Sequence, residues 1–172
     1  MSTDHDTLRG WLTGRLPQDW FTGPVTLDLD RDEITVVGPL AEPEVAADAT
    51  DAERAAAARG RAKAFREDTR EQRIEIASEL QHRTGRTVSW GVQIGEHREL
   101  FTTLSAPVMT RLRQADRQVL DTLVDSGVAR SRSDALAWCV RLVGSNTETW
   151  LADLRTAMEQ VAKVREAGPT TP

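Results

Sequence analysis

Arginine side chains carry the most evident chemistry in this sequence, and six of them lie between Ser105 and Val143. A guanidinium group presents a rigid fork of N–H donors that matches a phosphate group or the edge of a guanine base. The same segment holds four aspartates, so its formal charge is +2, whereas the whole chain carries −5. The acidic total argues against a protein that coats nucleic acid by bulk charge, but this segment can bind anions locally.

Side chains suited to catalysis or metal binding are few and scattered. The single cysteine, Cys139, excludes an internal disulfide and a multi-cysteine zinc site. The three histidines are His5, His82 and His97, and no carboxylate or cysteine spacing around them favours a metal. No Ser/His/Asp arrangement or glycine-rich phosphate loop is apparent either. We therefore expect no enzymatic activity, no metal and no cofactor.

The hydropathy of the chain gives an expectation about its location. The longest apolar runs are only a few residues, well below the ~20 that a membrane-spanning helix needs. The first six residues are acidic and polar, unlike a secretory signal. We expect a cytoplasmic, nucleoid-associated protein without a membrane contact.

The arginine-bearing segment must be positioned by a short strand and two helices. Val108 to Leu112 predicts the extended run, Gly127 the end of the first helix, and Ser131 the N-cap of the second, with Asp134 as its capping partner. Apolar residues recur at helical spacing in both helices: Val119, Leu120, Leu123 and Val124 in the first, and Leu136, Val140 and Val143 in the second.

This order and spacing resemble the ribbon-helix-helix DNA-binding family of Arc/MetJ type. The resemblance covers about 37 residues and rests on Arg111-Leu112, Asp116-Arg117, Leu120-Asp121-Thr122-Leu123 and Ser131-Arg132-Ser133-Asp134-Ala135-Leu136. In that family two chains pair their strands antiparallel, four helices form one intertwined core, and the ribbon enters the major groove of double-stranded DNA. The resemblance implies a homodimeric DNA-binding transcriptional regulator, such as a repressor.

The resemblance also implies roles for particular residues. The dimer core would contain Val108, Leu112, Leu120, Leu123, Leu136 and Val140. Met109 and Arg111 would face DNA bases, and the phosphate contacts would come from Arg113, Arg130, Ser131, Arg132 and Ser133. Two positions depart from the family pattern: Pro107 stands where many relatives carry a polar or basic base reader, and Thr110 is polar where an aliphatic residue is usual.

Residues 1–104 predict a separate module of class α+β. The pattern predicts a helix over Thr7–Leu16, a hairpin of strands Val25–Leu29 and Glu33–Val37, one helix over Asp51–His82 with a bend at Gly60, a strand over Val88–Ile94, and a further strand over Leu100–Leu104. The simplest packing is a small antiparallel sheet with helices on one face. Trp11, Trp20 and Trp90 are expected to fill its core rather than a ligand pocket.

The expected organisation is an α+β module over 1–104, the ribbon-helix-helix over 105–144, a final helix over 145–167 and a disordered tail over 168–172. The final helix carries an apolar stripe from Trp150 to Val164 that can pack on the protein's own core, on a dimer mate or on a protein partner. Two alternatives to a regulator stay open. One is an adaptor that keeps the dimer without reading DNA and binds a protein through the N-terminal module or the final helix. The other is an antitoxin-like repressor.

Overall fold

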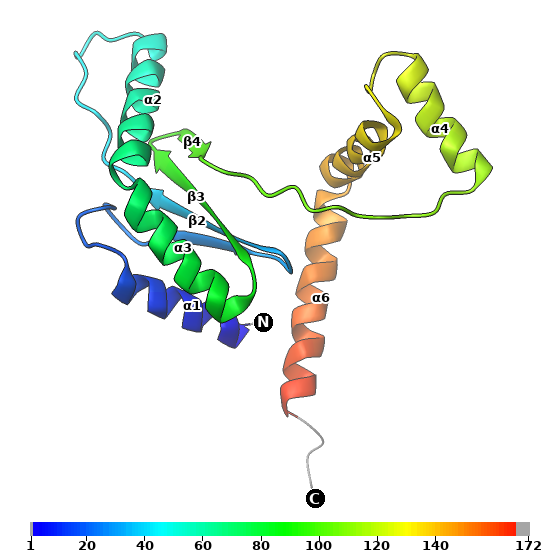
Figure 1. Ribbon diagram of the computed structural model, residues 1–172, viewed down its shortest axis with the longest axis horizontal. Coiled ribbons are helices and arrows are strands. Elements are labelled where there is room, and N and C mark those ends of the chain that lie inside the picture. Colours follow the sequence, from blue (N-terminus) through cyan, green and yellow to red (C-terminus); the bar gives the residue numbers. More distant parts are fainter. Residues whose placement is uncertain (1, 168–172) are drawn as a thin grey trace, which may run out of the picture. The chain divides into compact units, whose positions relative to one another are not determined.

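The computed structural model describes residues 2–167 and divides between Pro107 and Val108 into two compact units (Figure 1). The N-terminal unit contains helices α1 (Ser2–Arg15), α2 (Asp51–Asp68) and α3 (Arg70–Thr84) and strands β1 (Thr26–Leu29), β2 (Glu33–Pro39), β3 (Thr87–Ile94) and β4 (His97–Leu100). The C-terminal unit contains α4 (Gln114–Asp125), α5 (Arg132–Asn146) and α6 (Glu148–Ala167). The chain is thus of class α+β, and the predicted tail over 168–172 lies outside the described residues.

The N-terminal unit is built on one mixed sheet with strand order β1-β2-β3-β4. The outer pairs, β1 with β2 and β3 with β4, are antiparallel, but the central strands β2 and β3 run parallel, with Val36 opposite Trp90. The prediction of a fully antiparallel sheet is therefore wrong at the centre. Helices α2 and α3 form the crossover that a parallel pair of strands requires. The strand–helix–strand order in the sequence could therefore have indicated the parallel pairing.

The predicted single helix over Asp51–His82 is two helices that meet at Thr69, so the expected bend at Gly60 is also misplaced. Thr69 Oγ1 donates to the carbonyl of Phe65 at 2.6 Å. The buried guanidinium of Arg73 donates to Thr69 Oγ1 at 2.9 Å and to the carbonyl of Arg66 at 2.7 Å. These bonds satisfy carbonyl groups at the end of α2, where a helix leaves acceptors unpaired.

The start of α2 follows its sequence signals closely. The side chain of Thr50 accepts a hydrogen bond from the Glu53 N–H at 3.3 Å, and the Glu53 carboxylate accepts one from the Thr50 N–H at 2.7 Å. This reciprocal capping box satisfies two amide groups at the helix end. The α3 helix ends at Gly85, whose φ of 71° lies in the left-handed region that favours glycine.

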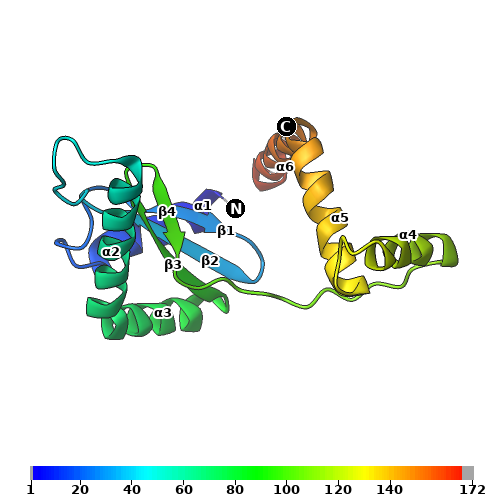
Figure 2. The ribbon, with the colours of Figure 1, turned by 90° about the horizontal axis from the view of Figure 1, so that it is seen from above.

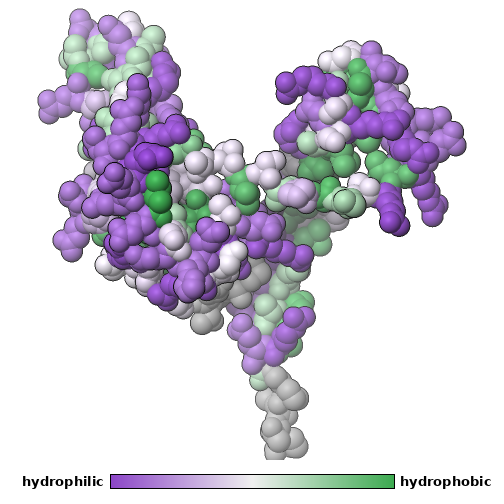
Figure 3. Space-filling model, viewed as in Figure 1, coloured by the Kyte–Doolittle hydropathy of each residue, from purple (hydrophilic) through white to green (hydrophobic). Residues whose placement is uncertain are grey.

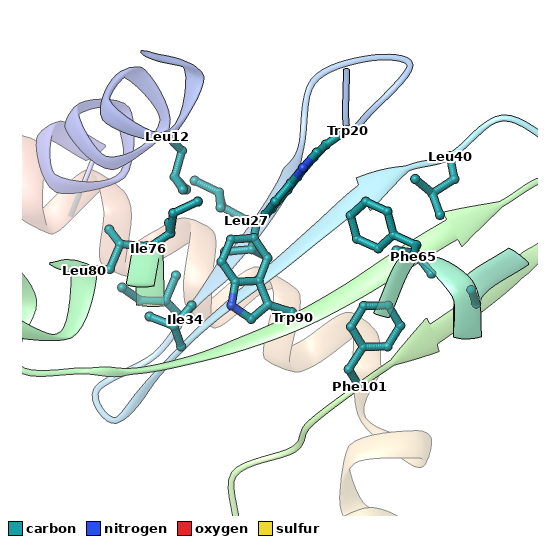
Figure 4. Packing of buried hydrophobic residues seen from close by; sticks show 14 of the residues in the cluster. Leu12, Trp20, Leu27, Ile34, Leu40, Phe65, Ile76, Leu80, Trp90 and Phe101 are labelled. Carbon is teal, nitrogen blue, oxygen red and sulfur yellow. The ribbon is translucent and has the colours of Figure 1, made fainter. Parts of the chain in front are cut away.

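One apolar core fills the space between the sheet and the three helices of this unit. Alternate residues of β2 and β3 supply one side of it, among them Ile34, Val36, Trp90 and Val92, and Figure 4 shows Leu12, Phe65, Ile76 and Leu80 converging on them from the helices. Because the buried side chains of α1, α2 and α3 meet this same face, the predicted helical layer on one side of the sheet holds. Figure 2 shows the same helices and sheet from above.

The tryptophans of this unit take the predicted packing role. Trp20 and Trp90 are buried, with ring centroids 6.2 Å apart in an edge-to-face arrangement. Trp11 packs half-buried against the same core, with the Arg83 guanidinium 5.2 Å from its ring. Aromatic pairs of this geometry contribute about 0.5–1.5 kcal/mol beyond the area that they bury.

The last strand of the sheet begins earlier than the pattern predicts. Residues His97–Leu100 form β4, and the predicted strand over Leu100–Leu104 is wrong because pairing with β3 ends at Gly91 opposite Leu100. Phe101 then enters the core, and the Leu104 N–H donates to Glu33 Oε1 at 3.1 Å. The same carboxylate oxygen accepts from the Ser89 hydroxyl, so Glu33 holds the end of this unit against its sheet.

The C-terminal unit is helical and has a small core. Leu120, Ala129 and Ala135 are buried, and partly buried side chains pack around them. Gly127, with a φ of 76°, sits in the turn that ends α4, as the sequence predicts. Among the described residues, no helix is both long and apolar enough to cross a membrane.

Candidate nucleic-acid interface

The segment predicted to form the ribbon is extended but unpaired in the single chain. Residues 102–113 belong to no helix or strand, and the structure pairs no strand with them among residues 2–167. Val108 is 86% exposed and Met109 is 97% exposed. Arg111 is exposed as well, while Leu112 packs half-buried against the core of the C-terminal unit. The backbone donors and acceptors of Val108–Arg111 are therefore open to a second strand.

Two contacts fix the end of this segment to α4. The Asp116 carboxylate accepts a hydrogen bond from the Arg113 N–H at 3.3 Å, which caps the helix start. Arg117 Nη1 donates to the carbonyl of Leu112 at 2.7 Å. The Arg113 side chain stays exposed. The direction in which the extended segment leaves α4 is thus set by side chains within the same unit.

The start of α5 has the predicted cap. Ser131 is extended, and its side chain accepts a hydrogen bond from the Asp134 N–H at 3.2 Å. The Asp134 carboxylate accepts from the N–H of Arg130 at 3.0 Å, one residue before the position that a standard capping box uses. The amides of Arg132 and Ser133, which the cap does not engage, lie at the positive end of the helix dipole, where an anion is stabilised.

The Arg132 side chain has a partner that the sequence did not indicate. Its Nε and Nη2 donate to the two carboxylate oxygens of Asp121 at 2.6 and 2.7 Å, a bidentate pair between α5 and α4. The hydrogen bond to Arg132 lowers the pKa of Asp121, and the same bond raises the pKa of Arg132. The guanidinium predicted to contact phosphate is thus engaged inside the unit, and eleven residues of separation give no helical signal for this pair.

The predicted site residues fall into two groups. Arg130, Ser131, Arg132 and Ser133 come together at the start of α5, where Arg130 is 96% exposed in its side chain. Met109 and Arg111 lie on the extended segment, and no hydrogen bond or ion pair within residues 2–167 joins them to that helix start. Neither Arg111 nor Arg113 forms an ion pair in the part of the chain that the structure describes.

The predicted dimer-core residues also divide. Leu120 is buried, and Leu112, Leu123 and Leu136 pack partly buried around it. Val108 and Val140 are 86% and 65% exposed, and neither side chain belongs to the buried cluster of the C-terminal unit. Within residues 2–167, no group of three His, Cys, Asp or Glu residues is placed to hold a metal ion.

These features define the chain as a two-unit α+β protein whose helical C-terminal unit presents a free extended segment. It belongs to the Rv1265-like protein family: the model of that family's N-terminal domain matches residues 6–100, and the model of the Mb1296 C-terminal domain matches residues 113–165. Neither matched model is that of a ribbon-helix-helix family.

The relatives are mycobacterial. The chain is 58% identical over 162 residues to the uncharacterized protein Mb1296 of Mycobacterium bovis and to the uncharacterized protein Rv1265 of Mycobacterium tuberculosis. The alignment covers 94% of this chain and 70% of each relative. No solved structure matches the chain.

Proposed function

We propose that the protein is a homodimeric DNA-binding regulator in which residues 108–112 of two chains pair as an antiparallel ribbon. The observation that carries this proposal is the extended, unpaired segment that leads directly into two helices joined by a tight turn. Unpaired backbone groups with exposed apolar side chains favour pairing with another strand. The exposure of Val108 and Val140 supports a second copy, because a second chain could cover both apolar side chains.

The size of the core supports the same conclusion. Three buried residues form the centre of the C-terminal unit. Units with so little buried apolar surface usually need a second chain for stability. Pairing two units would join two small cores, as the resemblance to the ribbon-helix-helix family implies.

In this proposal the arginines have different roles. Arg111 contacts base edges from the outer face of the ribbon, and Met109 offers an apolar contact. Phosphate is held by the amides of Arg132 and Ser133 at the start of α5, with Arg113 and Arg130 adding charge. The Arg132 guanidinium orients that helix start through Asp121 rather than reaching the DNA itself.

The proposal is tested by fluorescence polarisation with genomic DNA fragments at two salt concentrations. Arg111→Ala should weaken specific binding by roughly 5- to 150-fold, the equivalent of about 1–3 kcal/mol. Arg155→Ala, an exposed arginine on α6, is the matched control and should bind as the wild type does. Absence of salt-dependent binding by the wild type, or equal binding by the two variants, would overturn the proposal.

The adaptor remains the second candidate, and one observation favours it. The Arg132–Asp121 pair places a carboxylate at the helix start where phosphate would bind, which lowers the local affinity for an anion. Residues 1–104 carry a formal charge of −6, with 13 basic and 19 acidic residues, which also disfavours DNA. Stoichiometric recovery of one protein in a pull-down, without DNA, would support this alternative.

A further inference from the structure

Helix α6 is an amphipathic helix without a packing partner in its own unit. None of its residues, all within the described range, is buried. Trp150 is 58% exposed, Leu154 42%, Met158 71% and Val161 58%. Apolar residues at the surface of this unit are visible in Figure 3. An isolated helix is only marginally stable in water, and helices in proteins gain most of their stability from packing their apolar face. The apolar face of α6 therefore needs a partner.

The apolar residues of α6 follow the spacing of a helix-pairing seam. Trp150, Leu154, Ala157, Val161 and Val164 lie four and three residues apart in alternation, as core positions do when two helices pack along their length. The charged side chains all lie outside these positions: Glu148, Asp153, Arg155, Glu159, Lys163, Arg165 and Glu166. Two identical seams can therefore face each other without like charges in contact.

The sizes of the seam residues distinguish the two directions of pairing. In a parallel pair each residue meets its own copy, which stacks Trp150 on Trp150 and Ala157 on Ala157 and leaves layers of very different width. In an antiparallel pair centred between Arg155 and Thr156, Trp150 meets Val161 and Leu154 meets Ala157 of the second chain. Each of the larger side chains, Trp150 and Leu154, then faces a smaller one, which is the arrangement that packs without voids or overlap.

The flanks of the seam fit the antiparallel direction as well. Leu151 and Met158 lie next to the seam on one side, and the antiparallel pair sets Leu151 of one chain beside Met158 of the other. Asp153 and Gln160 meet on the opposite side, where a carboxylate can accept from an amide. Opposed helix dipoles also favour this direction over the parallel one.

We propose that α6 is a self-association surface that binds the α6 helix of a second copy of this chain, antiparallel, with Trp150 against Val161 and Leu154 against Ala157. The size complementarity of the seam with itself selects a second copy over an unrelated protein. The inference does not depend on DNA binding or on ribbon pairing, because α6 lies outside the segment that would form the ribbon.

Disulfide cross-linking tests both the partner and the direction. In a full-length Cys139→Ala background, Trp150→Cys and Val161→Cys chains with different tags are co-expressed and oxidised. The antiparallel pair predicts a cross-link between the two different chains only. In that arrangement the two copies of position 150 lie eleven residues apart along the axis, or about 16 Å, which is beyond the reach of a disulfide.

A second pair guards against the loss of Trp150. Asp153→Cys with Gln160→Cys lies on the flank of the same seam, keeps Trp150, and should give the same mixed cross-link. Cross-links within each variant alone would show a parallel pair, and absence of the mixed product for both pairs would show that α6 does not self-associate. Either result overturns the proposal, and neither bears on DNA binding.

The mass of the protein in solution gives an independent measurement. Leu154→Glu places a charge in the seam and should shift the sedimentation equilibrium towards a smaller species. Thr156→Glu, on the opposite face of α6, is the matched control and should leave the mass unchanged. Circular dichroism checks that both variants retain their helices. The same association constant for Leu154→Glu and the wild type would contradict self-association through α6, whether or not the ribbon also joins the two chains.

Discussion

One ion pair joins the helices α4 and α5 of the C-terminal unit. Asp121 on α4 and Arg132 on α5 form the bidentate pair already described, with half-exposed side chains on both sides. Exposed pairs usually contribute little, but a bidentate arginine–carboxylate pair is the geometry in which they contribute most. This pair joins two helices that otherwise share a small core, so its loss affects the relative position of α4 and α5.

The pair predicts a pH dependence of stability. The Arg132 hydrogen bond lowers the pKa of Asp121 in the folded protein. The contribution of the pair to the free energy of unfolding is therefore complete above the ordinary carboxyl pKa of about 3.9. It is lost as the pH falls through the lowered pKa of Asp121 in the folded protein. Asp121→Asn should reduce the melting temperature of the C-terminal unit at pH 7 and flatten its acid dependence below about pH 4.

Thermal unfolding followed by circular dichroism between pH 2 and pH 7 measures this effect. Asp125→Asn, at an exposed position near the end of α4, serves as the control and should keep the acid dependence of the wild type. Identical pH profiles for Asp121→Asn and the wild type would show that the pair does not stabilise the fold.

For single residues, the sequence predicted caps and core positions better than it predicted which side chains bind each other. The Ser131 cap and the core tryptophans follow from local pattern, because a cap or an apolar side chain acts on its immediate neighbours. Arg73 and Arg132 resemble every other arginine in the sequence. Yet Arg73 is buried over the Phe101 ring at 5.0 Å, and burial lowers its pKa, while Arg132 binds Asp121. Such pairings arise only when tertiary structure brings distant segments together.

The position of β4 depends on a close approach between strands. A Cβ atom at Gly91 would lie 2.6 Å from the Leu100 side chain and 2.8 Å from the Glu99 carbonyl oxygen. No ordinary side chain fits there without moving the backbone of β4. The glycine therefore permits the edge strand to pair with β3 across this point.

Two glycine-to-alanine substitutions, which should change the stability of the N-terminal unit in opposite directions, test this close approach. Gly91→Ala should destabilise the N-terminal unit by about 1–3 kcal/mol through overpacking against β4. Gly60→Ala, inside α2 with nothing within 4 Å of an added Cβ, should stabilise it by about 0.5–1 kcal/mol. Urea denaturation measures both free energies of unfolding, and a neutral Gly91→Ala would rule out the close approach.

The elements themselves were largely predictable, and their connections were not. Alternation identified the hairpin and the strand over Val88–Ile94, since large apolar residues recur at every second position in each strand. The break at Thr69 was hidden because the residues around it favour helix, and it is stabilised by Arg73 and Thr69 side chains. The parallel pairing of β2 with β3 leaves no trace in periodicity, although the intervening helices allow it to be inferred.

The whole molecule consists of two units with unequal cores. The N-terminal unit buries a large continuous cluster, whereas the C-terminal unit buries three residues and exposes many apolar ones. The matches to two separate domain models fall on either side of residues 101–112. The two units are therefore expected to differ in how their stability depends on a second chain.

Protein concentration should separate the two units. If a second copy completes the C-terminal unit, its stability rises with concentration by mass action, and that of the N-terminal unit does not. Hydrogen exchange of the full chain at two protein concentrations reports on both units in one sample. Amides of α4 and α5 should exchange more slowly at the higher concentration, with those of β3 unchanged. Equal rates at both concentrations would contradict a requirement for a second chain.

The parallel central pair sets an order in which the N-terminal unit can fold. The β1–β2 hairpin has only local contacts and can form as soon as residues up to Pro39 are available. Its other edge has to wait for β3, which arrives after residues 40–86 have been synthesised. Closing so long a loop slows folding, and until then one edge of the hairpin is open to pairing with other chains. During synthesis this half-finished sheet is the state in which a molecular chaperone would matter most.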